Sequence, residues 1–86
     1  MKEILIVCRS ITYAQRASRA IGRVGVSHQI LRLPAGVVNS GCGYAVRVRS
    51  SYLRAALRAM AQEGMQPSAL FVWENGAYRE VRHDLS

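Results

Sequence analysis

The sequence predicts a single α+β domain in which two helices cover one face of a β-sheet. Its 86 residues are the length of one domain. The hydrophobic pattern alternates between the strand and helix periods, in the order strand, helix, strand, strand, helix, strand. The dipeptide Asn75-Gly76 is a strong hairpin signal and predicts one more strand after these six elements.

The first third of the chain should form a strand, a helix and a second strand. Residues 2–8 are a continuous apolar run, typical of a strand buried on both faces. Thr12, followed three residues later by Gln15, has the form of a capping box and predicts a helix start. Gly25 predicts its end, and residues 27–33 predict the second strand. The apolar stripe expected on this helix is Ala14, Ala17, Ile21 and Val24.

The remaining elements follow a loop at residues 34–43, which is rich in Pro, Gly, Asn and Ser. Apolar side chains alternate over residues 44–49 and predict a strand. A second helix should begin at Ser50 or Ser51 and end near Gly64. Residues 69–74 and 77–82 predict the last two strands. The apolar stripe of the second helix is Leu53, Ala56, Leu57 and Met60.

This element order is that of the ferredoxin-like βαββαβ two-layer sandwich. Right-handed crossovers then give the sheet order 4-1-3-2, with the added strand outside the fourth. Residues 1–86 form one such domain, with a core at about residues 2–74 and a hairpin strand and tail at 75–86.

Strands one and four carry apolar side chains on both faces, although helices should cover only one. Ile4 and Ile6 alternate with Leu5 and Val7 on the first strand, and Leu70 and Val72 alternate with Phe71 and Trp73 on the fourth. The simplest cover for the second face of so short a chain is another copy of itself. We therefore expect a homodimer through the open face of the sheet.

Composition excludes several classes of protein. No apolar run approaches the roughly 18 residues that span a bilayer, and the apolar start is too short for a signal peptide. Half of the residues are hydrophobic, which excludes intrinsic disorder. A cytoplasmic protein is expected, with Cys8 and Cys42 as reduced thiols.

The predicted topology brings the two cysteines to one end of the sheet. Cys8 ends the first strand and Cys42 lies in the loop before the third, which is its neighbour. The N-terminus of the first helix, a favourable place for an anion, lies at the same end. Cys42 is therefore a candidate reactive thiolate, and Cys8 a candidate resolving thiol. The residues expected to favour an anion here are Arg9, Thr12, Ser40, Gly41 and Gly43.

Plainer interpretations stand beside this one. Cys8 can be a small buried core residue, and Cys42 a turn residue between two glycines. A zinc site built from both cysteines with His28 and His83 is geometrically poor, because the histidines fall elsewhere on the sheet. No metal or other cofactor is predicted. The carboxylates are scattered and common hydrolase motifs are absent, so a freestanding enzyme is not indicated.

The loop also carries a family resemblance. Thr12, Pro34 and the segment NSGCGYAVR at residues 39–47 are similar to the selenium/sulfur (Se/S) carrier protein-like family, over roughly residues 4–74. The resemblance implies that Cys42 transiently holds sulfur or selenium as a persulfide or selenosulfide, received from a donor protein and passed to an acceptor. The chain departs from the family in its added hairpin and in its arginine content.

The charge supports two alternative functions. Twelve Lys and Arg against five Asp and Glu give a net charge of +7, and eleven of the twelve are Arg. A basic ferredoxin-like domain can bind RNA, although the predicted sheet lacks the usual base-stacking aromatics. The other alternative is a regulatory module that dimerises and binds a partner protein. The candidate nucleic-acid residues are Arg16, Arg19, Arg23, Arg47, Arg49, Arg54 and Arg58.

Overall fold

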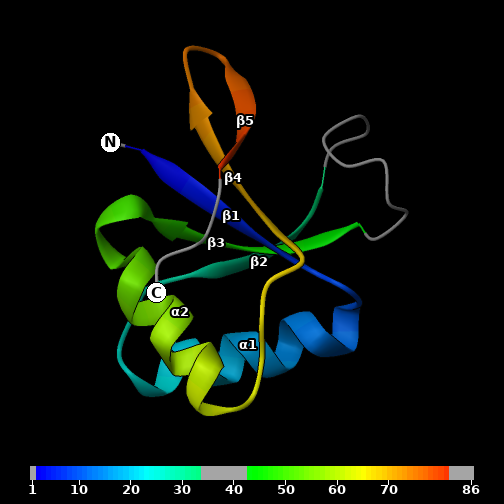
Figure 1. Ribbon diagram of the computed structural model, residues 1–86, viewed down its shortest axis with the longest axis vertical. Helices are drawn as coiled ribbons and strands as arrows, with labels where there is room; N and C mark the ends of the chain where they lie inside the picture. Colours follow the sequence, from blue (N-terminus) through cyan, green and yellow to red (C-terminus); the bar gives the residue numbers. More distant parts are fainter. Residues whose placement is uncertain (1, 34–42, 82–86) are drawn as a thin grey trace.

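The computed structural model describes residues 2–33 and 43–81, and it has a five-stranded sheet with two helices packed on one face (Figure 1). The helices are α1 (Ile11–Arg23) and α2 (Leu53–Gln62), the latter preceded by the 3₁₀ turn η1 (Ser50–Tyr52). The strands are β1 (Glu3–Cys8), β2 (Gln29–Arg32), β3 (Tyr44–Arg49), β4 (Ala69–Glu74) and β5 (Ala77–Val81).

The strand order is β2-β3-β1-β4-β5, and every neighbouring pair is antiparallel. Counted from the opposite edge, this is the order expected from the sequence, with β5 outside β4. The α+β class is thus confirmed. Assignment to the ferredoxin-like folds depends also on the handedness of the crossovers, and it stays a prediction.

The start of α1 differs from the sequence prediction. Ser10, not Thr12, is the N-cap, and its Oγ accepts a hydrogen bond from the Tyr13 N–H at 3.0 Å. Thr12 lies inside the first turn, so the expected capping box with Gln15 was wrong by two residues. Ser10 takes the role because its backbone is extended as the chain leaves β1, as an N-cap requires.

The start of α2 also differs. Neither Ser50 nor Ser51 caps it through a side chain, because both lie in η1. The Leu53 N–H instead donates to the Ser50 carbonyl, and this tight turn leads directly into the helix. Beyond the helix C-termini, Gly25 and Gly64 have positive φ angles of 78° and 72°, as expected of helix-terminating glycines.

The strand bounds agree best where local signals are strongest. β3 and β4 are as expected, and the turn at Asn75-Gly76 has two positive φ angles, 55° and 77°. β2 is shorter than the expected 27–33 at both ends. On α1 the expected stripe residue Val24 is 50% exposed, because the helix ends at Arg23 and Ala20 is buried in its place.

Both faces of the sheet carry buried side chains. The helix side holds the larger core, to which β1 contributes Ile4, Ile6 and Cys8. The side away from the helices, here called the outer face, holds a second cluster: Leu5, Val7, Ala45 and Phe71. These four are buried within one chain, so their burial does not by itself call for a second copy. The homodimer stays a prediction, and Trp73 on the same face is 44% exposed.

Candidate functional site

The candidate site lies at the end of the sheet where β1 stops and β3 begins. Cys8, the last residue of β1, is the register partner of Tyr44, the first residue of β3. Tyr44 is in turn the partner of Arg32 at the end of β2. The chain enters β3 through Gly43, whose carbonyl accepts a hydrogen bond from the Leu33 N–H at 2.6 Å. The last residues of β1 and β2 and the first residue of β3 therefore lie together at the end of the sheet where the loop residues were expected.

Cys8 is fully buried in the helix-side core, with 0% of its surface exposed. Its Sγ lies 3.6 Å from the carbonyl oxygen of Ile6. This agrees with the plainer interpretation of Cys8 as a core residue. Its role as a resolving thiol stays a prediction, and burial at this level keeps dissolved reagents from the sulfur.

Cys42 and two of its expected neighbours, Ser40 and Gly41, lie outside the described residues. Gly43 is described and half-buried. A Cβ built on Gly43 would lie 4.0 Å from the Cγ of Arg32, so the stem of this arginine runs beside the end of the loop.

Two guanidinium groups are held against aromatic rings at this end. The Cζ of Arg9 lies 4.6 Å from the ring centre of Tyr13, and the Cζ of Arg32 lies 5.9 Å from that of Tyr44. Among the described residues neither guanidinium has a carboxylate partner, whereas Lys2, Arg23, Arg47 and Arg79 all do. The two guanidinium groups therefore give this end of the sheet a positive charge that no described carboxylate neutralises.

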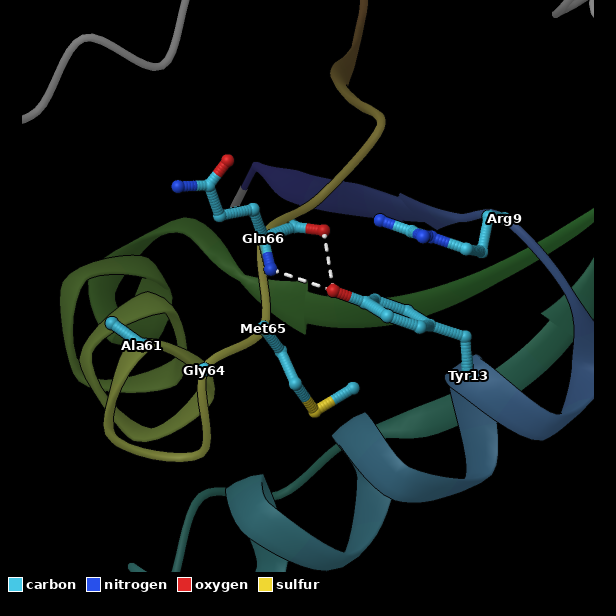
Figure 2. A pocket seen from close by; sticks show the side chains of 6 residues that line it. All are labelled: Arg9, Tyr13, Ala61, Gly64, Met65 and Gln66. Carbon is cyan, nitrogen blue, oxygen red and sulfur yellow. Dashed lines mark hydrogen bonds between the residues drawn. The ribbon is translucent and has the colours of Figure 1, made fainter.

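A hollow of about 250 Å³ adjoins this end, between the start of α1 and the segment after α2 (Figure 2). Its lining residues are Arg9, Tyr13, Ala61, Gly64, Met65 and Gln66. The Tyr13 hydroxyl accepts a hydrogen bond from the Gln66 N–H and donates one to the Gln66 carbonyl. No local sequence pattern singles out Tyr13, because its hydrogen-bond partner lies 53 residues away in the chain.

The candidate nucleic-acid arginines divide between two surfaces. Arg16, Arg19 and Arg23 lie on α1, and Arg54 and Arg58 on α2, all exposed. Arg47 and Arg49 lie on the outer face, where Arg47 contacts Gln29 and Glu3. The structure does not gather all seven into one patch.

Within residues 2–33 and 43–81, no group of three or more His, Cys, Asp or Glu side chains is arranged to hold a metal ion. Both ring nitrogens of His28 are engaged. Its Nδ1 donates to the Val26 carbonyl at 2.9 Å, and its Nε2 lies 2.6 Å from the Ser18 Oγ. His83 lies outside the described residues.

Neither described helix has the length and apolar character needed to cross a membrane. A family model with the description "Putative Se/S carrier protein-like" matches residues 3–72. No curated protein and no solved structure matches the chain. The matched span contains β1 through most of β4 and both cysteines.

Proposed function

Because the chain belongs to the Se/S carrier protein-like family, we propose that it carries sulfur or selenium on Cys42, as a persulfide or selenosulfide. The observation that carries the proposal is the arrangement at the end of the sheet where β3 begins. There the carbonyl of Gly43, the residue after Cys42, accepts a hydrogen bond from the Leu33 N–H, and the side chain of Arg32 lies beside Gly43.

The positive charge at this end of the sheet supports the proposal that the Cys42 thiol is reactive. Arg9 follows β1 directly, and Arg32 ends β2 opposite the start of β3. Nearby guanidinium groups and a helix N-terminus lower the pKa of a cysteine thiol, because they stabilise the thiolate. We expect Cys42 to titrate below the ordinary thiol value of about 8.5.

The transfer needs no acid–base machinery. The Cys42 thiolate attacks the terminal sulfur of a donor protein's persulfide, a new S–S bond forms, and the donor's S–S bond breaks. The donor cysteine leaves as a thiolate, and the chain now carries the sulfur with no net oxidation or reduction. The reverse exchange onto an acceptor empties the carrier. Glu63 is the only carboxylate in residues 4–73, which suits a reaction of this kind.

The experiment uses the reduced protein, a cysteine desulfurase and L-cysteine. Trypsin places Cys8 on a peptide of residues 3–9 and Cys42 on a peptide of residues 33–47, so mass spectrometry separates the two sites. We expect a gain of about 32 Da, one sulfur atom, on the second peptide. The gain should persist in Cys8→Ala and vanish in Cys42→Ser. Equal loading of Cys42→Ser, or no loading of the wild type, would overturn the proposal.

A pH series of alkylation rates tests the electrostatic part. Arg32→Gln should raise the apparent pKa of the Cys42 thiol, because it removes a positive charge beside Gly43. Arg58→Gln removes the same charge from α2 and serves as the control. If the two variants shift the pKa equally, Arg32 has no particular role in activating Cys42.

A resolving role for Cys8 has its own signature in this assay. Cys8 would attack Cys42 Sγ, form an intramolecular disulfide and release the carried sulfur as hydrosulfide. In that case Cys8→Ala should lengthen the lifetime of the persulfide without changing its rate of formation.

A further inference from the structure

The solvent-facing sides of α1 and α2 form one basic surface, here called the helix-layer surface. It consists of five exposed arginines, Arg16, Arg19, Arg23, Arg54 and Arg58. They lie opposite the buried stripes of the two helices, which contain Ala14, Ala17 and Ile21 on α1 and Ala56 and Met60 on α2. The two helices pack side by side on one face of the sheet (Figure 1). Because the arginines of each helix lie opposite its buried stripe, both rows are on the side of the helices that faces away from the sheet.

The negative charge of the described residues is concentrated elsewhere. Glu74, which pairs with Lys2 and Arg79, and Glu3, which pairs with Arg47, both lie on strands of the sheet. Among the described residues, the only carboxylate on the helix layer is Glu63, which pairs with Arg23 at 3.2 Å. In the described part of the chain, Arg16, Arg19, Arg54 and Arg58 make no ion pair, so their charge faces solvent.

We propose that the helix-layer surface binds the phosphate backbone of double-stranded nucleic acid. Arginine presents a planar fork of donors that matches phosphate oxygens, and rows of exposed arginines repeated along two adjacent helices suit a repeating polyanion.

The residues between the arginines favour a nucleic-acid duplex over a protein, a membrane surface or a single strand. Among the described residues, the exposed large apolar ones are Ile11, Val24, Tyr52 and Trp73. Of these, Ile11 and Val24 lie at the two ends of α1, Tyr52 precedes α2, and Trp73 lies on the sheet. The middle of the surface therefore lacks the buried anchor of a protein interface and the apolar face that inserts into a membrane. It also lacks the row of aromatics on which single strands stack.

This surface shares no residue with the proposed sulfur site. Its arginines lie on the exposed sides of the helices, whereas the candidate thiol belongs to the loop that enters β3. The binding should therefore be unchanged in Cys42→Ser, and the loss of one activity does not imply the loss of the other.

The test measures binding of the full chain to a fluorescent RNA duplex and a DNA duplex of equal length, by anisotropy, over a series of salt concentrations. With four to five phosphate contacts, the logarithm of the binding constant should fall with the logarithm of salt at a slope of about −4. The double variant Arg54→Gln with Arg58→Gln should reduce this slope to about −2. Gln and Arg have similar helix propensities, so both helices should persist, which circular dichroism checks.

The matched control is Arg47→Gln with Arg49→Gln, which removes the same charge from the outer face and should leave the slope near −4. Equal losses in the two double variants would mean that only net charge matters, and would overturn the proposal. So would no binding at about 50 mM salt. Tighter binding to a single-stranded RNA, to anionic lipid vesicles or to an acidic protein than to either duplex would also overturn it. Preference between the RNA and DNA duplexes identifies which backbone is favoured.

Discussion

The hydroxyl of Tyr13 is held between two backbone groups of Gln66, a residue 53 positions further along the chain. The Gln66 N–H donates to the hydroxyl at 2.7 Å, and the hydroxyl donates to the Gln66 carbonyl at 3.1 Å (Figure 2). The contact ties the first turn of α1 to the segment between α2 and β4. It also positions the ring on which Arg9 rests.

Tyr13→Phe should lower the free energy of unfolding by about 1–2 kcal/mol, since it removes two modest hydrogen bonds and water partly replaces them. Urea denaturation followed by circular dichroism measures the change. Tyr52→Phe makes the same chemical change at a tyrosine whose hydroxyl has no hydrogen bond among the described residues, and it should be nearly neutral. Equal effects would show that the Tyr13–Gln66 contact adds no stability.

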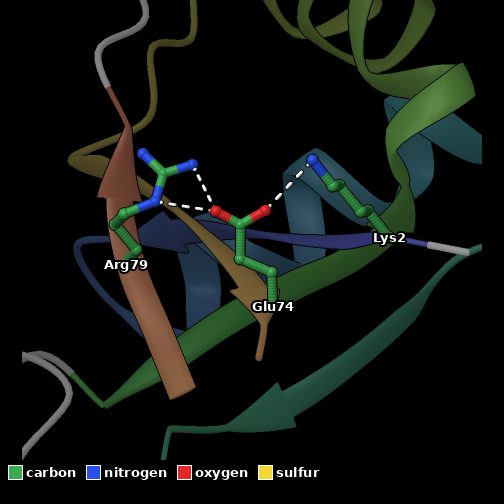
Figure 3. A network of polar contacts seen from close by, with 3 residues as sticks. All are labelled: Lys2, Glu74 and Arg79. Atoms are coloured by element: carbon green, nitrogen blue, oxygen red, sulfur yellow. Dashed lines mark hydrogen bonds and ion pairs between the residues drawn. The ribbon is translucent and has the colours of Figure 1, made fainter. Parts of the chain in front are cut away.

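Glu74 makes stability depend on pH at the edge formed by β4 and β5. Arg79 donates to its Oε1 through Nη2 at 2.6 Å and Nε at 2.9 Å, and Lys2 Nζ lies 3.0 Å from its Oε2 (Figure 3). The hydrogen bonds from Arg79, and then from Lys2, lower the pKa of Glu74 below its usual 4.5. Its stabilising effect is therefore complete above that value and is lost as pH falls through the lowered pKa.

Glu74→Gln should therefore lower the melting temperature at pH 7, and the difference from wild type should shrink at pH 3. Thermal denaturation at the two pH values measures this. Glu80→Gln, on β5, is the control, because Glu80 makes no ion pair within the described structure. A difference from wild type that stays constant with pH would contradict the assignment.

Two glycines three residues apart should respond oppositely to alanine. Gly22 is inside α1, and a Cβ there would meet only the His28 Cε1 at 3.5 Å, an ordinary contact. Gly22→Ala should therefore stabilise the protein by about 0.5–1 kcal/mol. Gly25 has a φ of 78°, so Gly25→Ala should cost about 1–2 kcal/mol. Thermal denaturation checks both, and destabilisation by Gly22→Ala would show that the His28 ring cannot accommodate the methyl group.

Cys8 should be protected from alkylation by the fold. In a Cys42→Ser background, iodoacetamide can reach Cys8 only when β1 separates from the helix-side core. We expect labelling of the native protein to be at least about a hundredfold slower than in urea. Mass spectrometry of the peptide of residues 3–9 follows the reaction. Rapid labelling of the native protein would contradict the observed burial.

The sequence by itself determined the elements that depend on local chemistry. The alternation over residues 44–49 predicted β3, and Asn75-Gly76 predicted the hairpin, because a backbone with two positive φ angles suits few residue pairs. Gly25 and Gly64 marked the helix ends, because the positive φ angle found there favours glycine. These signals lie within a few residues of the feature they predict. The family was also recognisable from one loop and the spacing around it.

Tertiary structure decided what depends on the path of the chain between elements. Whether Ser10 or Thr12 caps α1 follows from where β1 ends and the backbone turns, and either residue has a suitable side chain. The partner of Tyr13, the burial of Cys8 and the division of the arginines between helix layer and sheet depend on elements distant in sequence. Periodicity predicts which side of a helix or strand is apolar, but packing decides which side chains from elsewhere in the chain meet it.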